Sequence, residues 1–130
     1  MNEYQPDVLC LQETKAFEDQ FLKEVGEIEG YNYIWHSGER PGYAGTAIFY
    51  REELEVTDSD NFFEGRDHFH DDGRVTQIEL DDTVIFNGYF PNGGTRADGT
   101  EMVGYKLDFY NHLIEHANQL VAAGKNVILT

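Results

Sequence analysis

The chain has 130 residues, 40% of them hydrophobic and 14% aromatic, which allows one globular core and excludes a second. The formal net charge of −16, from 25 acidic and 9 basic residues, argues against nucleic acid as a partner, although a site responds to its local charge. No apolar run approaches the length of a membrane span, and the first residues lack a secretory signal pattern. With a single cysteine, Cys10, these features favour a cytoplasmic protein.

The first half of the chain contains apolar runs typical of strands and one amphipathic segment. Residues 8–12 are predicted to form a short buried strand. Residues 17–28 carry apolar side chains at helical spacing, and Gly30 is placed to end that helix. Residues 31–36 and 44–50 are predicted strands joined by a loop.

A charged, irregular stretch is predicted at residues 58–72. It precedes a predicted β-hairpin, in which residues 75–80 and 83–90 form the strands and Asp81-Asp82 the turn. Strands of this kind, alternating with helices, predict an α/β protein.

The clearest predicted helix lies near the end of the chain. Its apolar side chains step by three and four residues along one face, which we expect to face the core: Val103, Leu107, Tyr110, Ile114, Ala117 and Val121. Gly124 ends this helix, and residues 126–130 begin a predicted buried strand. Because the chain starts just before one core strand and stops at the end of another, we expect residues 1–130 to be a single partial domain.

Glu13 follows directly on the first predicted strand. A carboxylate in that position points into the crevice where open α/β sheets bind ligands. Its hard oxygen atoms suit Mg²⁺ or Mn²⁺, which take one or two carboxylates together with phosphate oxygens. Lys15 could then meet the charge of the phosphate. Taken alone, the pentapeptide Leu-Gln-Glu-Thr-Lys at residues 11–15 favours the start of an ordinary loop over a metal site.

A second motif, Asn-Gly-Tyr-Phe-Pro-Asn-Gly-Gly, stands where the second hairpin strand gives way to a loop. Its glycines permit close backbone approach, while Tyr89 and Asn92 offer hydrogen-bond donors to a phosphate. The alternative is a glycine-rich turn with a packed tyrosine. Two weaker motifs place Tyr43 and Gly45 in a loop that runs into a strand, and Arg74 at the entrance to another strand.

Together, in this order, the segments PDVLCLQETK, GYAGTAIFYR, GRVTQIEL, NGYFPNGG and KLDFYNHL resemble the exonuclease III family of apurinic/apyrimidinic (AP) endonucleases. The resemblance runs from Gln5 to Thr130. It implies an α/β fold that is part of a four-layer sandwich, with two packed mixed sheets flanked by helices. It also implies Mg²⁺-dependent cleavage of double-stranded DNA beside an abasic site, or at a 3′ end.

The resemblance also implies roles for individual residues. Glu13 matches the metal-ligating glutamate, Tyr89 the active-site tyrosine beside the scissile phosphate, and Asn92 a polar residue that contacts this phosphate. The loop with Tyr43 and Gly45 matches a loop that contacts the DNA backbone, with Ala44 where serine is common. Lys15, Arg74 and Arg96 are further expected substrate contacts, Arg96 in a tract that varies within the family.

Several family motifs have no counterpart in residues 1–130. These are an N-terminal strand with an active-site asparagine, a Gly-Asp-x-Asn motif, a metal-linked aspartate and a Ser-Asp-His motif. We therefore expect the chain to be inactive alone and to self-associate, whereas the full-length enzyme is expected to be a monomer. Two alternatives stay open: a non-catalytic truncated fragment, and a sister phosphatase or phosphodiesterase with a non-DNA substrate, which the acidic charge favours.

The segment His112-Leu-Ile-Glu-His116 matches the H-x-x-E-H pattern of inverted zinc peptidases. Both histidines share one helical face. We expect that face to lie opposite the apolar stripe and to point to solvent, so the match is interpreted as chance. His68 and His70 are assigned to a solvated loop.

Overall fold

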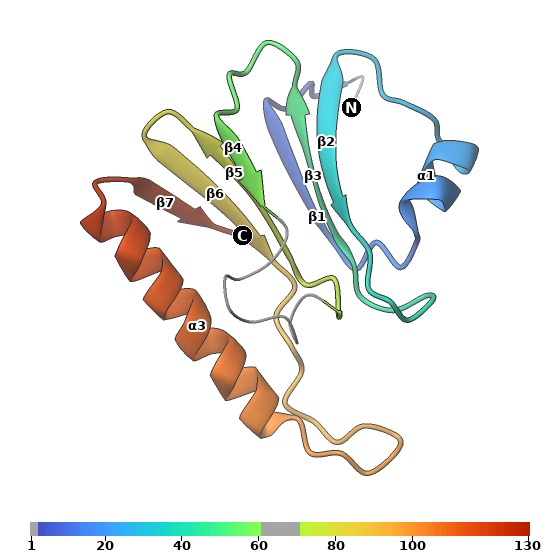
Figure 1. The fold of residues 1–130 in the computed structure, drawn as a ribbon. Coiled ribbons are helices and arrows are strands. Elements are labelled where there is room, and N and C mark those ends of the chain that lie inside the picture. Colours follow the sequence, from blue (N-terminus) through green and yellow to red (C-terminus); the bar gives the residue numbers. More distant parts are fainter. Residues whose placement is uncertain (1–2, 61–70) are drawn as a thin grey trace.

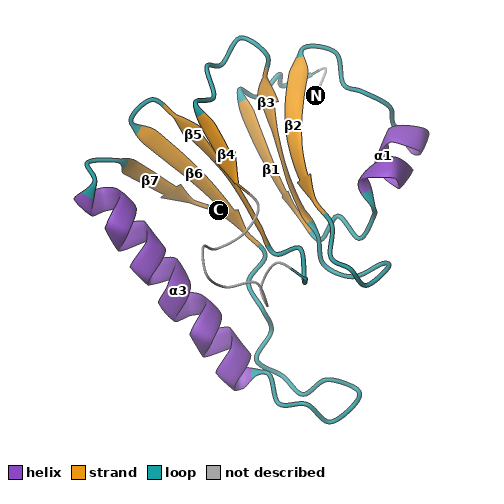
Figure 2. Ribbon diagram, in the orientation of Figure 1, coloured by secondary structure: helices purple, strands orange, loops and turns teal. Residues whose placement is uncertain are grey.

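The computed structural model describes residues 3–60 and 71–130, which form two β-sheets with one helix against the outer face of each (Figure 1). The layers follow the order helix, sheet, sheet, helix, as Figure 2 shows, which is the predicted α/β sandwich. Across these described residues, neither helix combines the length and apolar character needed to cross a bilayer.

The first sheet has the strand order β1–β3–β2 and is antiparallel in the described residues. Its strands are β1 (Val8–Gln12), β2 (Tyr31–His36) and β3 (Thr46–Arg51). β3 begins two residues later than predicted. The reason is local, because Ala44 and Gly45 have φ angles of 50° and 89°, which an extended strand does not accommodate.

The second sheet is mixed and has the strand order β4–β5–β6–β7, with β6 and β7 parallel. Its strands are β4 (Asp58–Asp60), β5 (Val75–Leu80), β6 (Thr83–Gly88) and β7 (Asn126–Leu129). β4 corrects the prediction of an irregular stretch at 58–72, of which residues 61–70, with His68 and His70, lie outside the described residues. The hairpin is confirmed, since Leu80 pairs with Thr83 across a turn in which Asp81 has a φ of 47°.

Two strands predicted to be buried lie at sheet edges. Within the described part of the chain, β1 pairs with β3 alone and β7 with β6 alone. An edge strand has a neighbour on one side only, so its side chains keep contact with solvent. Ile128 and Leu129 are 47% and 48% exposed, which makes the prediction of a buried final strand wrong.

Helix α1 (Glu18–Glu24) is shorter than the predicted segment 17–28. Gly26, with a φ of 79°, follows the last turn and ends the helix four residues before Gly30. Phe21 anchors α1 to the outer face of the first sheet. Its ring stacks on Trp35 with centroids 4.8 Å apart and meets Phe49 edge-on at 5.5 Å.

Helix α3 (Val103–Ala122) presents a different face to the sheet from the one predicted. Phe109 and Leu113 are buried, whereas four members of the predicted stripe are half exposed: Val103, Leu107, Ile114 and Val121. The prediction that His112 and His116 point to solvent is also wrong. His116 faces the sheet, where its Nε2 lies 2.6 Å from Gln77 Oε1, and His112 is partly buried.

Two apolar cores hold these layers together. Ile48, Ile78 and Ile85 fill the space between the two sheets, with Val8, Cys10, Ile34 and Tyr50 among the side chains packed around them. Val75, Phe86, Phe109 and Leu113 form the second core between the second sheet and α3. The two sheets are therefore fixed face to face, so that the loop after β1 lies close to the loop after β6.

Candidate active site at the ends of β1 and β6

Glu13 and Tyr89 meet across the two sheets. Glu13 is the first residue after β1, and Tyr89 is the first residue after β6. The Tyr89 hydroxyl donates a short hydrogen bond to Glu13 Oε1. This bond is the main reason why the pKa of Tyr89 rises to about 12, and it lowers the pKa of Glu13, with a smaller contribution from the charge of Lys15. At neutral pH the pair therefore consists of a carboxylate and a protonated phenol.

The loop that carries Glu13 has an unusual backbone. Glu13 and Lys15 have φ angles of 54° and 52°, a region that non-glycine residues seldom occupy. Two hydrogen bonds hold the loop there: Thr14 N donates to Gly45 O at 3.2 Å, and Lys15 N donates to Ala44 O at 2.9 Å. Lys15 Nζ lies 3.7 Å from Glu13 Oε2. Strain of this kind is characteristic of functional sites.

Gly45 is required by this contact between loops. Its φ of 89° disfavours other residues, and a Cβ atom at this position would lie 2.2 Å from Thr14 Oγ1. The conformation of the Glu13 loop thus depends on a glycine 32 positions later in the chain. The DNA contact predicted for Gly45 stays a prediction beside this structural role.

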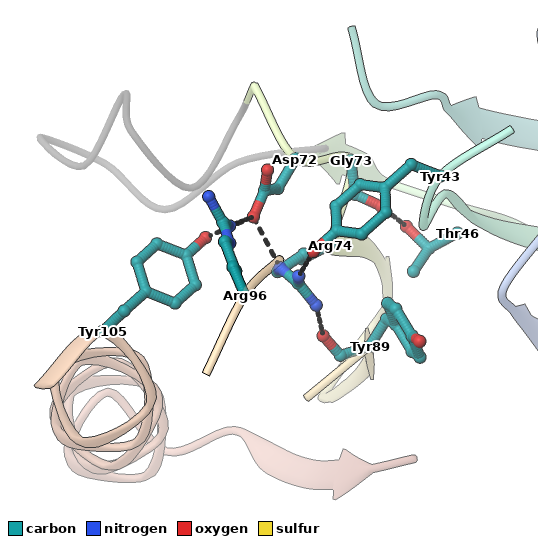
Figure 3. A network of polar contacts seen from close by, with 8 residues as sticks. All are labelled: Tyr43, Thr46, Asp72, Gly73, Arg74, Tyr89, Arg96 and Tyr105. Carbon is teal, nitrogen blue, oxygen red and sulfur yellow. Dashed lines mark hydrogen bonds and ion pairs between the residues drawn. The ribbon is translucent and has the colours of Figure 1, made fainter. Parts of the chain in front are cut away.

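Arg74 lies beneath the site and is almost wholly buried, with 3% of its side chain exposed. As Figure 3 shows, its guanidinium reaches toward Tyr43, Asp72 and Tyr89. Nη2 donates to the Tyr43 hydroxyl at 2.8 Å, Nη1 to the backbone oxygen of Tyr89 at 3.1 Å, and Nε to Asp72 Oδ2 at 2.9 Å. Each guanidinium nitrogen is thus engaged by the protein, so Arg74 positions the two tyrosines. The substrate contact predicted for it stays a prediction.

Asp72 was not singled out from the sequence. The same Oδ2 atom accepts a hydrogen bond from the Tyr105 hydroxyl at 2.9 Å and lies 3.7 Å from Arg96 Nη2. Burial, and then the charge of Asp72, raise the pKa of Tyr105. Because Tyr105 belongs to α3, Asp72 ties that helix to the site. The sequence feature that could have indicated Asp72 is its position two residues before Arg74. The short Asp-Gly-Arg turn brings the two side chains together.

A small cavity of about 170 Å³ adjoins this network. It is lined by polar and basic side chains together with backbone of the glycine-rich loop: Tyr43, Arg74, Asn92, Gly94, Thr95, Arg96 and Met102. Asn92 is exposed, and its Oδ1 accepts a hydrogen bond from Gly94 N at 3.1 Å. Asn92 and Arg96 therefore line the cavity next to Tyr43 and Arg74, which Glu13 and Tyr89 do not line.

The side chains of the site suit a Mg²⁺ ion that keeps several water ligands, and do not suit a metal ion coordinated by the protein on all sides. Among the described residues, no group of three or more His, Cys, Asp or Glu side chains gathers to hold a metal. Glu13 offers one ionised carboxylate with half of its side chain exposed. Mg²⁺ characteristically binds through one or two carboxylates and keeps its other positions for water and phosphate oxygens. Glu13 fits that pattern as a single ligand.

The chain is similar over residues 1–130 to the Endonuclease/Exonuclease/phosphatase family. It is 33% identical over 102 residues to a DNA-(apurinic or apyrimidinic site) endonuclease of Dictyostelium discoideum, covering 78% of this chain and 27% of that protein. It is 31% identical over 126 residues to exodeoxyribonuclease III of Haemophilus influenzae, covering 89% of this chain and 43% of that protein. The chain thus spans less than half the length of these curated relatives.

Solved structures share the arrangement of the two sheets. The catalytic domain of Xenopus laevis APE2 has a TM-score of 0.82 at 23% identity, covering 98% of this chain and 50% of that one, which shows a common fold. The 3′ phosphatase NExo from Neisseria, bound to a product DNA hairpin, has a TM-score of 0.76 at 25% identity, with coverage of 98% and 47%.

Proposed function

The chain belongs to the endonuclease/exonuclease/phosphatase family, and we propose on that basis that the protein containing it is a DNA-repair nuclease. Its exonuclease III and AP endonuclease relatives bear out the resemblance seen in the sequence. The proposed reaction is hydrolysis of phosphodiester bonds beside abasic sites and at 3′ ends of duplex DNA. The observation that carries the proposal is the contact between Glu13 and Tyr89, because it joins the ends of both sheets in one open polar site.

Glu13 is the proposed ligand of Mg²⁺, for which Mn²⁺ could substitute. Its carboxyl group, whose pKa is lowered from 4.5 by the bond from Tyr89 and then by Lys15, is ionised at neutral pH. A divalent ion bound there would neutralise charge on a phosphate and polarise its oxygens. Lys15 Nζ lies 3.7 Å from the other oxygen of the same carboxylate, Oε2. A phosphate bound beside Glu13 would therefore also lie near this ammonium group.

Tyr89 acts as a hydrogen-bond donor in this proposal. The bond to Glu13 raises the pKa of Tyr89 to about 12, so the hydroxyl keeps its proton at neutral pH and is proposed as a donor. When substrate binds, a phosphate oxygen can replace Glu13 as the acceptor of this hydrogen bond, while the proton stays on Tyr89. Arg74 holds the Tyr89 backbone and the Tyr43 hydroxyl, which limits the motion of both side chains. Preorganised donors of this kind stabilise charge that develops on a phosphate.

Local charge supports duplex DNA as the substrate despite the net charge of −16. Three exposed basic side chains lie on loops around the site: Lys15, Arg40 and Arg96. Arg40 lies over the Tyr43 ring, 5.2 Å from its centroid, and Arg96 is exposed beside the cavity. Tyr43, Asn92 and Arg96 are the proposed contacts to the DNA backbone. A negative surface elsewhere would weaken non-specific binding, because it repels the phosphate backbone of DNA.

The activity is proposed for the longer protein, as a cytoplasmic monomer, and not for residues 1–130 alone. The described residues offer one carboxylate for the metal and one phenol for the phosphate, and a hydrolase also needs an activated water. We expect the isolated chain to leave an abasic-site duplex intact and the longer protein to cleave it in the presence of Mg²⁺. Cleavage by the isolated chain would contradict the expectation that it is inactive alone.

The test compares two substrates. An abasic-site duplex and a small phosphomonoester are incubated with the longer protein, with Mg²⁺ and with a chelator. The nuclease proposal predicts metal-dependent cleavage of the duplex at a rate far above that of the phosphomonoester. The reverse preference would overturn it in favour of a phosphatase with a small substrate, which the acidic composition would also suit.

A further inference from the structure

Asn87 is a fully buried polar residue between the two sheets, two positions before Tyr89. Its Nδ2, which carries two hydrogens, lies within hydrogen-bond distance of three acceptors: the backbone oxygens of Leu11 and Ala47, both at 3.0 Å, and Thr76 Oγ1 at 3.1 Å. Leu11 and Ala47 belong to the first sheet, whereas Asn87 belongs to the second. The amide therefore bridges the sheets at the end where the candidate site lies.

The oxygen atom of the Asn87 amide accepts a hydrogen bond from the residue that precedes Glu13. Gln12 Nε2 donates to Asn87 Oδ1 at 2.6 Å, and Gln12 immediately precedes Glu13. Alternate residues of a strand point to the same face, so Asn87 and Tyr89 both point toward the first sheet. The bond from Gln12 to Asn87 thus runs beside the bond from Tyr89 to Glu13, one residue earlier in the first segment and two residues earlier in the second.

A buried amide in this place needs a reason. Its neighbours along the inward faces include Ile48, Ile78 and Ile85, and a leucine of similar volume would bury apolar surface without any polar requirement. Buried polar groups whose hydrogen bonds are satisfied define one arrangement among several, because shifted arrangements leave them without partners. Sliding of one sheet over the other would break the bonds of Asn87 to β1 and β3 together.

We propose that Asn87 is a positioning residue, which acts through Gln12 to hold Glu13 at the distance where Tyr89 contacts it. The catalytic meaning of this arrangement rests on the proposed function, whereas the geometry itself does not. Asn87 would contact neither metal nor substrate. Its effect would be to fix the separation of the two halves of the site, which come from different sheets.

The first test uses the metal-free chain. Nuclear Overhauser effects (NOEs) between the Tyr89 ring protons and the Glu13 methylene protons report their contact. Asn87→Leu and Gln12→Met should each weaken or abolish these NOEs, and Gln12→Met, at a solvent-exposed position, avoids the risk of unfolding. The control is Ile78→Val, which perturbs the core between the sheets without touching the amide and should keep the NOEs. Retention of the NOEs in both amide variants, or their absence from the wild-type chain, would overturn the proposal.

The second test separates this proposal from the proposed function. Mn²⁺ binding is followed by electron paramagnetic resonance for the wild-type chain and for Glu13→Ala, Asn87→Leu and Gln12→Met. Loss of a residue that supports a metal ligand lowers metal affinity by about tenfold or more, and we expect that loss in both amide variants. The double variant should lose little beyond Asn87→Leu alone, because both substitutions remove the bond between Gln12 and Asn87. Binding that Glu13→Ala leaves unchanged would count against the metal site, while the NOEs still decide the role of Asn87.

Discussion

Replacing Asp72 with alanine removes the anionic partner of a guanidinium that has almost no access to water. The side chain of Arg74 is 3% exposed and that of Asp72 is 21% exposed, with Nε and Oδ2 2.9 Å apart. Removing one partner of a buried ion pair typically costs about 3–5 kcal/mol, because the remaining charge stays desolvated without compensation. Since Asp72 keeps some contact with water, we expect Asp72→Ala to lower the free energy of unfolding by about 3 kcal/mol, the lower end of that range.

Urea unfolding followed by fluorescence provides the measurement, because Trp35 is the single tryptophan of the chain. The double variant Asp72→Ala/Arg74→Met removes both charges and should recover much of the loss. Tyr105→Phe deletes one hydrogen bond to Asp72 and should cost about 1 kcal/mol. A loss below about 1 kcal/mol for Asp72→Ala, within the range of exposed ion pairs, would refute the assignment of a buried, coupled pair.

Three further predictions address other parts of the site. Gly45→Ala should destabilise the chain and broaden the NMR resonances of the Glu13 loop, because its Cβ would meet Thr14 Oγ1; an unchanged spectrum would contradict this. Tyr89→Phe removes the main cause of the lowered Glu13 pKa, so carboxyl ¹³C titration should show this pKa rising toward 4.5. In the longer protein, activity that needs ionised Glu13 should be present at neutral pH and should disappear as the pH falls through the Glu13 pKa. In Tyr89→Phe this pKa is higher, so the loss should occur at a higher pH than in the wild type. Zn²⁺ should leave the thermal midpoint of the chain unchanged, since His116 contacts Gln77 of the sheet and His112 contacts Asp108 of its own helix. A clear rise of the midpoint would contradict the interpretation of the H-x-x-E-H match as chance.

The sequence was most informative at strand ends. An apolar run followed by a carboxylate, and another followed by a tyrosine, predicted Glu13 and Tyr89 as site residues, and the structure brings both together. This works because a short strand fixes where its last residue points. The partners that hold them were not predicted. Asn87, and the bond of Asp72 to Tyr105, depend on residues distant in the sequence, for which local spacing carries no signal.

The orientation of α3 shows a second limit. The helix carries two apolar stripes, and the one with more aliphatic residues was expected to face the core. The sheet instead takes the stripe of Phe109 and Leu113, whose flanking polar side chains find partners there: Tyr105 with Asp72, and His116 with Gln77. Apolar spacing alone does not identify such a face, because hydrogen bonds offset the burial of its Tyr and His side chains. The end of α1 was missed for a simpler reason, since Gly26 and Gly30 both suit a helix terminus.

Glu13→Gln in the longer protein tests the central claim most directly, since glutamine keeps the shape of the side chain and removes the charge that would bind Mg²⁺. Cleavage of an abasic-site duplex is measured as a function of Mg²⁺ concentration, with Glu24→Gln on the exposed face of α1 as the matched control. Supporting residues around metal ligands are worth about 10–100-fold, so loss of the ligand itself should lower the rate by about 100-fold or more, and the control should leave it unchanged. A Glu13→Gln protein that cleaves at the wild-type rate, with the same Mg²⁺ dependence, would contradict the assignment of Glu13 as the metal ligand.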